Sequence, residues 1–227
     1  YTRPMQPFDV RGNESLGVQR AYTLEFAGAQ RFGGRGEVSL TTYATRVGGR
    51  VAYVQRGLYL SAQNLLDEWY AGCEAEARYQ ILPSLSARLG VGFASLVSQE
   101  QNATVLVTGS PESLQPLFPK LQAHLLVDWR LPFWGLRVSP EISFISAREA
   151  SQSNEMLLDE SYSLPAYVYT ALALSSPDRK LFGDRPTSLS VRVSNFLVGT
   201  DWADPGFNGV DVPAQGHTVL FTLSQGL

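Results

Sequence analysis

The sequence predicts an all-β fold, a transmembrane antiparallel β-barrel with about nine or ten strands in this chain, as part of a larger barrel. Apolar and polar residues alternate with a period of two along segments of roughly ten residues. Short and long connections alternate between these segments. Charged residues make up only 17% of the 227 residues. No run approaches the roughly 18 apolar residues of a membrane-spanning helix.

The bulk composition narrows the possible classes of protein. The net charge of −3 offers no argument for nucleic-acid binding. The single Cys73 has no partner for an internal disulfide. The opening residues do not resemble a signal peptide, so we expect either that a leader has been removed or that the chain starts inside a longer one.

The first clear alternation lies in 70–81. Odd-numbered residues from Cys73 to Ile81 are apolar there, and even-numbered residues from Glu74 to Gln80 are polar or charged. From 85 to 93, odd-numbered residues are again apolar, and the even-numbered residues from 84 to 92 are Ser, Arg or Gly. The two sets of an extended strand face opposite sides of a sheet.

The later segments repeat this pattern. Between Lys120 and Arg130, odd-numbered residues from Leu121 to Trp129 are apolar, and all even-numbered ones except Leu126 are polar or charged. From Leu136 to Phe144 the apolar residues are even-numbered. The alternation recurs in 188–194 and 218–224, where the odd-numbered residues are apolar. A soluble sandwich also alternates, but full charges at mid-strand favour a wet lumen on one side.

Nine strands are predicted in all. They cover 18–28, 37–47, 70–81, 85–97, 118–130, 135–147, 165–176, 188–198 and 215–226. Segment 50–62 is either a tenth strand or an extension of a hairpin above the membrane. An odd number leaves a parallel seam or an open edge, whose unpaired backbone groups are costly in lipid. Nine strands therefore favour a section of a larger barrel, whereas ten permit a small closed one.

The connections and aromatic residues agree with this reading. Short connections are expected at 82–84 and 131–134, and long ones at about 98–117, 148–164 and 199–214. The glycines at 31–36 and 48–49 predict turns. Aromatic side chains near strand ends suit the two membrane interfaces, or alternatively anchor loops of a soluble fold: Trp69, Tyr70, Trp129, Phe133, Trp134, Phe196 and Trp202.

The order of several short motifs resembles the C-terminal part of a TonB-dependent receptor barrel. The matching stretches are 70–76 (YAGCEAE), 118–123 (FPKLQA), 164–170 (LPAYVYT), 190–196 (SVRVSNF), 204–207 (DPGF) and 213–218 (PAQGHT). The resemblance implies the last nine or ten strands of a barrel of about 22 strands. Barrels of this family import scarce, bulky ligands such as iron–siderophores, cobalamin or sugars.

The chain departs from the family pattern at three points. Nothing in it matches the family's N-terminal plug or TonB-contacting box, and without a plug this chain alone does not carry out gated import. The last residue is Leu227, where such proteins usually end in an aromatic residue. His217 stands where the family often has arginine.

Ten charged or titratable residues on the polar faces are candidates to line a solute path or to grip a plug. The plainer interpretation is that they are lumen residues whose charges pair across neighbouring strands. They are Glu74, Glu76, Arg78, Arg88, His124, Asp128, Arg130, Arg137, Glu141 and Arg192.

Metal binding and catalysis have weaker support. Asp201, Asp204 and Asp211 could bind calcium, but their spacing matches no standard loop, and solvated turn residues are the favoured reading. A hydrolase could use His124 or His217 as its histidine base, but the sequence indicates no particular residue as the nucleophile. We therefore expect no enzyme activity, no catalytic residue, no metal and no cofactor. On the apolar face, Cys73 reads as a small hydrophobic residue.

The sequence thus predicts one domain over 1–227, the C-terminal segment of a barrel in the bacterial outer membrane. The first hypothesis for its function is a receptor for a scarce, bulky ligand. The alternatives are a plugless scaffold barrel in an envelope assembly, a passive porin and a soluble β-sandwich. Expected partners are outer-membrane lipid, a plug domain or other envelope proteins, and a small-molecule ligand for a receptor, but no nucleic acid.

Overall fold

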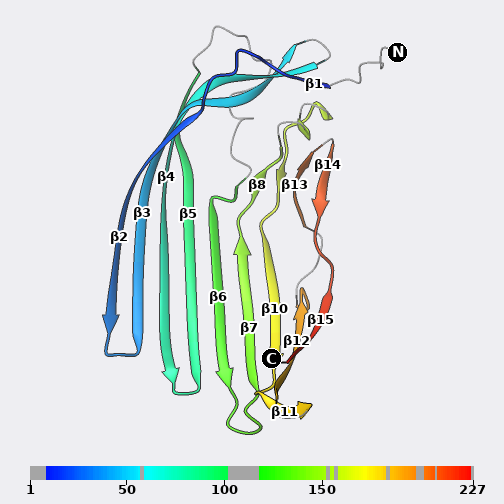
Figure 1. The fold of residues 1–227 in the computed structure, drawn as a ribbon. Helices are drawn as coiled ribbons and strands as arrows, with labels where there is room; N and C mark the ends of the chain where they lie inside the picture. The colour runs from blue at the N-terminus through cyan, green and yellow to red at the C-terminus, as the bar shows by residue number, and fades with distance from the viewer. Residues whose placement is uncertain are drawn as a thin grey trace. The chain divides into compact units, whose positions relative to one another are not determined.

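The computed structural model describes residues 9–56, 59–101, 118–151, 154–155, 158–182, 185–197, 202–207 and 209–225. β-Strands make up nearly all of the regular structure (Figure 1). Within the described ranges, no helix has both the length and the apolar character needed to cross a membrane.

Nine long strands occur among the described residues, and each overlaps one of the nine predicted strands in order. They are β2 (Arg20–Phe32), β3 (Gly36–Arg56), β4 (Tyr59–Leu82), β5 (Leu85–Gln101), β6 (Leu121–Arg130), β7 (Arg137–Ile145), β10 (Tyr167–Ser175), β12 (Arg185–Ser194) and β15 (Thr218–Gln225). The shorter strands are β1 (Asp9–Arg11), β8 (Arg148–Glu149), β9 (Ser163–Leu164), β11 (Arg179–Phe182), β13 (Ala203–Phe207) and β14 (Val210–Pro213).

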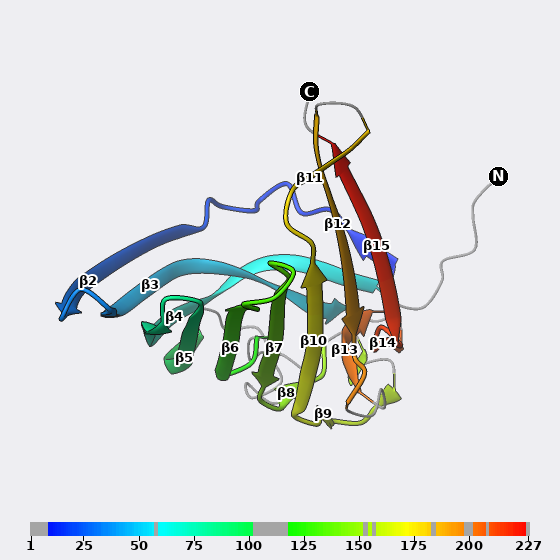
Figure 2. The ribbon, with the colours of Figure 1, turned by 90° about the horizontal axis from the view of Figure 1, so that it is seen from below.

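The long strands form one sheet in chain order, β2-β3-β4-β5-β6-β7-β10-β12, with β15 beside β12. The pairs from β5 to β15 are antiparallel. Two short strands join this sheet, since β11 pairs with β12 and β1 pairs in parallel with β4. Figure 2 shows β6, β7, β10 and β12 side by side in a single layer.

Each of the two outermost strands, β2 and β15, has one neighbour in the part of the chain that the structure describes. Every residue of both strands is exposed, on both faces. Among them are large apolar side chains, with 68% of Phe26 and 70% of Phe221 accessible. Over the described ranges, the sheet therefore has an open edge at β2 and another at β15.

The apolar face of the sheet is not covered by a second layer of described residues. Leu125, Ile142 and Leu189 are exposed there, by 36%, 45% and 47%. The buried apolar residues among those described are Ala150, Leu164 and Ala171. A soluble sandwich would bury the apolar faces of its strands in a dry core. The structure lacks this burial over the described strands, as expected for a sheet whose apolar face meets lipid.

The chain divides into two compact units. The first comprises 1–26, 42–73 and 94–116, and the second comprises 27–41, 74–93 and 117–227. Strands β2, β3, β4 and β5 contribute residues to both units. The second unit contains the whole of β6 to β15 and all ten candidate residues.

The region around residue 50 belongs to the two long strands β3 and β4. Segment 50–62 is not a separate strand, because it forms the end of β3 and the start of β4, apart from residues 57–58 outside the described ranges. The prediction of a turn at Gly48–Gly49 is wrong, because both residues lie within β3. Gly49 has φ of +65° there. A glycine with positive φ suits a strand irregularity as well as a turn, so the sequence signal was ambiguous.

In the first unit, this irregularity changes which side of the sheet the even-numbered residues of β3 face. Before it, Arg46 lies 3.7 Å from Asp67 and 6.0 Å from the ring centroid of Trp69. After it, Arg50 pairs with Glu68 and donates to the Tyr70 hydroxyl. Both arginines have even numbers, yet the first contacts odd-numbered residues of β4 and the second even-numbered ones. One extra residue in β3 accounts for the change.

Tight turns follow the predicted short connections. β4 ends at Leu82 and β5 begins at Leu85. The β6–β7 turn closes with the Leu131 N–H donating to the Leu136 carbonyl oxygen over 2.7 Å, and Trp134 and Gly135 both have φ of +65°. Trp134 remains 77% exposed, as a side chain at a membrane interface would be. The β2–β3 turn uses Gly33 and Gly34, also with positive φ.

Candidate functional site

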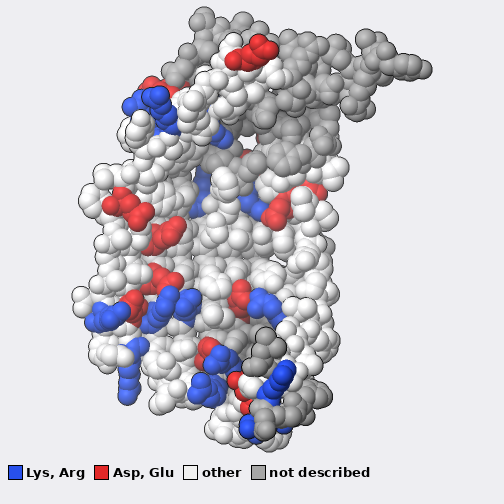
Figure 3. Space-filling model, viewed as in Figure 1, with Lys and Arg blue, Asp and Glu red and all other residues white. Residues whose placement is uncertain are grey.

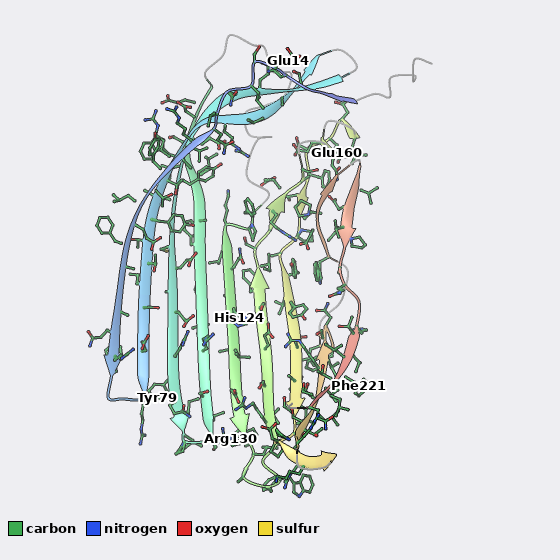
Figure 4. All side chains as sticks on the ribbon, viewed as in Figure 1. Glu14, Tyr79, His124, Arg130, Glu160 and Phe221 are labelled. Carbon is green, nitrogen blue, oxygen red and sulfur yellow. The ribbon has the colours of Figure 1, made fainter. Side chains whose placement is uncertain are left out.

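The register of the second unit brings the predicted polar residues onto one face of the sheet. Gly90 of β5 lies opposite His124 of β6, and Ser86 lies opposite Asp128. His124 in turn lies opposite Ser143 of β7, and Arg130 opposite Arg137. Figure 3 shows charged side chains distributed over the face of these strands that it displays. His124 lies midway along β6, and Arg130 at its end (Figure 4).

Most of the ten candidates are ion-paired, as the plainer interpretation of the sequence expects. Arg137 Nε lies 3.2 Å from Asp128 Oδ1 on the neighbouring strand. Glu76 Oε1 accepts a hydrogen bond from Arg78 Nε of its own strand. The same oxygen lies 3.9 Å from Arg88 Nε of β5. The role of these residues in lining a lumen stays a prediction, but their shared face and mutual pairing suit a hydrated wall.

Glu141 is the centre of the longest-range pair on this face. Its Oε2 accepts from Arg192 Nη2 over 2.6 Å, and its Oε1 lies 3.9 Å from His124 Nδ1. Arg192 is on β12 and Glu141 on β7, so the bond passes over β10. This is possible because β10 presents Ala171 and Ala173 between them.

Two candidates have no side-chain partner among the described residues. They are the carboxylate of Glu74 and the guanidinium of Arg130. Glu74 borders a cavity of about 550 Å³ over the middle of β3 to β7. Gly90 and Gly92 lie in the lining between Glu74 on β4 and His124 on β6. Because these two positions carry no side chain, the polar face is hollowed there.

A second cavity of about 690 Å³ lies over the turn end of β2 to β6. Four arginines line it, two of which are among the ten candidates. The remaining two, Arg31 and Arg35, flank the β2–β3 turn and were not selected from the sequence. Arginines beside a glycine-rich turn are common on exposed hairpins, so their spacing gave no signal.

The two long connections of the second unit fold against each other. Arg148 of β8, with its side chain 5% exposed, pairs with Asp204 of β13 and donates to the Ala203 carbonyl oxygen over 2.8 Å. Its guanidinium lies 5.1 Å from the ring centroid of Tyr167. The ring of Tyr167 stacks on Trp202, with 3.8 Å between centroids. Trp202 therefore packs against the start of β10, which is the loop-anchor role that the sequence offered as the alternative to an interfacial position.

A second set of hydrogen bonds joins the same two connections. The Asp211 carboxylate accepts from Asn154 Nδ2 over 3.1 Å and from the Tyr162 hydroxyl over 2.9 Å. The Gly209 N–H donates to Asn154 Oδ1 over 2.8 Å. Asn154 is fully buried. We call Arg148, Asn154, Tyr162, Asp204 and Asp211 together the loop clasp.

Two groups in or beside the loop clasp have shifted acidity. Burial raises the pKa of the Tyr162 phenol, and its hydrogen bond to the Asp211 carboxylate raises that pKa further. Burial also raises the pKa of the Glu155 carboxyl, against the opposing effect of a hydrogen bond from Ser161. Glu155 Oε2 is buried and has no hydrogen-bond partner among the residues that the structure describes. The Glu155 carboxylate is thus poorly solvated when charged.

The aspartates considered for calcium have other roles in the structure. Asp204 and Asp211 belong to the loop clasp, and Asp201 lies outside the described residues. Over the described ranges, no group of three or more His, Cys, Asp or Glu side chains is arranged to hold a metal ion. Asp204 and Asp211 each bond to side chains of another loop, while the Asp204 side chain stays 46% exposed.

The two histidines do not assemble a nucleophile with a base. His124 Nδ1 is 3.1 Å from Ser143 Oγ, and the same nitrogen is the one nearest to Glu141. A relay needs the nucleophile and the orienting carboxylate on opposite ring nitrogens. The ring of His217 contacts the backbone oxygen of Asn195, whose φ is +56°. His217 therefore holds the corner between β12 and β15.

The first unit contains a buried polar centre that the sequence did not indicate. Glu68 is fully buried, pairs with Arg50 and accepts from the Tyr70 hydroxyl over 2.5 Å. Nearby, Asn64 Oδ1 accepts from the Gly17 N–H over 2.6 Å, and its Nδ2 donates to the Gly49 oxygen over 2.6 Å. These bonds satisfy backbone groups where β3 is irregular. Tyr70 thus donates a hydrogen bond to a buried carboxylate. Its interfacial position stays a prediction.

No known family model matches the sequence, and no curated protein matches it. Solved structures do match. The FrpB iron transporter from Neisseria meningitidis is 12% identical, with a TM-score of 0.70 over 94% of this chain and 32% of that chain. The pyoverdine outer membrane receptor FpvA from Pseudomonas aeruginosa is 15% identical, with a TM-score of 0.66 over 97% and 31%. The copper transporter OprC is 14% identical, with a TM-score of 0.69 over 94% and 33%.

The chain therefore spans about a third of the length of these proteins and has the fold of that part of them. The predicted fold class, an antiparallel sheet of the outer-membrane β-barrel type, is confirmed.

Proposed function

We propose that this chain forms part of the barrel wall of an outer-membrane transport receptor for a scarce, bulky ligand of the siderophore, cobalamin or saccharide class. The observation that carries the proposal is the contrast between the two faces of one sheet. One face bears paired charges from β4 to β12, and the other exposes large apolar side chains. This contrast suits water on one side and lipid on the other.

The open edges support a wall that continues beyond these strands. The backbone groups of β2 and β15 that face away from their single neighbours need partners, and lipid offers none. Further strands of a larger barrel would supply them. The solved structures, about three times as long as this chain, have room for such strands.

The central cavity supports a partner inside the barrel. Glu74 brings a carboxylate without a described partner to a hollow where Gly90 and Gly92 leave space. A plug domain that presents a basic side chain there would neutralise this charge. The proposed plug is a separate claim from the proposed transport, because a plugless scaffold barrel would leave the hollow filled by another protein or by water.

The decisive experiment is ligand uptake by cells that carry or lack the gene for the complete protein. We expect saturable uptake of one ligand from a panel of labelled iron–siderophores, copper complexes, cobalamin and oligosaccharides. That uptake should stop when a protonophore collapses the energy supply, and a plasmid copy of the gene should restore it to the deletion strain.

Two other results would contradict the receptor proposal. Non-saturable, protonophore-insensitive entry of many small solutes would indicate a passive porin. Unchanged uptake of every ligand, together with a stable envelope protein that copurifies with the chain, would indicate a scaffold barrel.

A further inference from the structure

The cavity over the turn end of β2 to β6 has an unusual charge balance. Its lining holds four guanidinium groups, those of Arg31, Arg35, Arg78 and Arg88, and two carboxylates, those of Glu37 and Asp128. Figure 3 shows basic and acidic side chains gathered over the lower ends of these strands. The lining therefore carries an excess of two positive charges.

Both carboxylates of the lining are already engaged. Glu37 Oε2 accepts from Arg31 Nε over 2.8 Å. Asp128 pairs with Arg137, which comes from β7 and does not line the cavity. Neither acid is therefore free to neutralise the remaining arginines.

Arg78, Arg88 and Arg35 have few carboxylates as partners. Arg78 bonds Glu76, and Arg88 Nε lies 3.9 Å from the same Glu76 oxygen. Arg35 is exposed, and its side chain has no ion pair or hydrogen bond with any residue that the structure describes. Arg35 and Arg88 thus line one hollow, and neither guanidinium donates a hydrogen bond to a residue that the structure describes.

This arrangement matches the chemistry of an oxyanion. A guanidinium presents a planar fork of N–H donors that fits a carboxylate or phosphate with two parallel bonds. Like charges around a concave site raise the local concentration of anions. The volume of about 690 Å³ lies within the range of small-molecule pockets.

We propose that this cavity binds a small polyanion through its phosphate or carboxylate groups, with Arg35 and Arg88 as the anchoring residues. The site lies at the end of the strands that carries the short turns. It does not depend on the transport proposal, because a scaffold barrel or a porin with this wall would contain the same cavity.

The test is isothermal titration of the complete protein in detergent, with pyrophosphate and citrate as probes, at low ionic strength. We expect saturable binding of at least one probe, weakened by added salt because exposed charges are screened. Binding of pyrophosphate alone or of citrate alone identifies which oxyanion the site takes. Saturable binding of neither probe overturns the proposal.

The variants separate this site from general surface charge. The double substitution Arg35→Gln, Arg88→Gln should weaken binding by about tenfold or more, and each single substitution by a smaller factor. Arg130→Gln is the matched control, because Arg130 also lacks a described partner but does not line the cavity. Circular dichroism and heat-dependent electrophoretic mobility report whether each variant is folded. Equal weakening by Arg130→Gln, or unchanged affinity in the folded single variants, contradicts the proposal.

Discussion

The guanidinium of Arg192 reaches over strand β10 to the carboxylate of Glu141, with 2.6 Å between Nη2 and Oε2. The two residues are 51 positions apart in the sequence. Between them, β10 presents Ala171 and Ala173, whose short side chains leave the path open. One charge-assisted hydrogen bond therefore ties three strands together.

Loss of this bond should destabilise the sheet. Arg192→Met should lower the free energy of unfolding by about 1–2 kcal/mol, since both side chains remain partly exposed to solvent. Urea unfolding in lipid vesicles measures the change. A double-mutant cycle with Glu141→Gln should give a coupling energy of about 1 kcal/mol. A coupling energy near zero would mean that the bond contributes nothing to stability.

The alanine beneath the pair should not tolerate a larger side chain. Ala171 is 1% exposed and lies opposite both Glu141 and Ser194. Ala171→Leu should therefore cost about 1–3 kcal/mol through overpacking. Ala75→Leu is the control, because Ala75 is an exposed residue of β4. The same urea measurement applies, and equal stability of the two variants would contradict the predicted crowding.

The loop clasp should control the mobility of the β13–β14 hairpin. Asp211→Ala removes the acceptor of Asn154, Tyr162 and the Gly206 N–H. Amide exchange should then become at least about tenfold faster in 203–213, with no change in β6 and β7. Val212→Thr serves as the control, since Val212 is an exposed neighbour on the same strand. Unchanged exchange in Asp211→Ala would show that the hairpin is held by other contacts.

Glu155 should make the protein less stable as the pH rises. Its carboxyl pKa is raised above the ordinary 4.5, chiefly by burial, so the folded state holds this proton more tightly than the unfolded state does. Stability is therefore lost as the pH rises from 4.5 through the folded pKa. Glu155→Gln should raise the melting temperature at pH 7 and have little effect at pH 4. An equal change at both pH values would assign the effect to packing rather than to charge.

Neighbouring residues of β6 should differ in the medium that they contact. In a Cys73→Ala background, Leu125→Cys should react with a lipid-soluble maleimide and His124→Cys with a membrane-impermeant, water-soluble one. The reason is the alternation of the two faces, with Leu125 among the exposed apolar residues. Labelling of intact outer-membrane vesicles, and of vesicles opened on both sides, gives the comparison. Equal labelling of both positions by the water-soluble reagent would contradict a lipid-facing surface.

Strand positions and faces could be read from the sequence, because a period of two is a local property of the chain. The nine predicted strands occur in order, and the polar residues of β4 to β7 share a face. Strand lengths were less predictable. β3 continues from Gly36 to Arg56, where a glycine pair predicted a turn. Local pattern does not distinguish a turn from an irregularity within a strand, since both use positive φ.

The loop clasp and the cavity of arginines were not predictable, because both depend on contacts between distant segments. The sequence around Arg148 does not indicate that this residue pairs with Asp204, which lies 56 residues later. Trp202 is of a residue type that is common at membrane interfaces. Its stacking on Tyr167 depends on the fold and is not visible in the sequence. The ion pairs were foreseen as a class, but the partner of each charge depends on register and on small residues such as Ala171.

The irregularity at Gly48–Gly49 makes β3 sensitive to the number of residues rather than to their identity. Deleting the one extra residue there would restore strict alternation and leave the two arginines three positions apart, on their present opposite sides. The fully buried Glu68 would then keep Arg50 as its cationic partner. Deleting two residues would place the arginines two positions apart and turn Arg50 to the side that Arg46 now occupies, so Glu68 would lose that partner. Length changes of odd and even size in this strand should therefore be tolerated very differently.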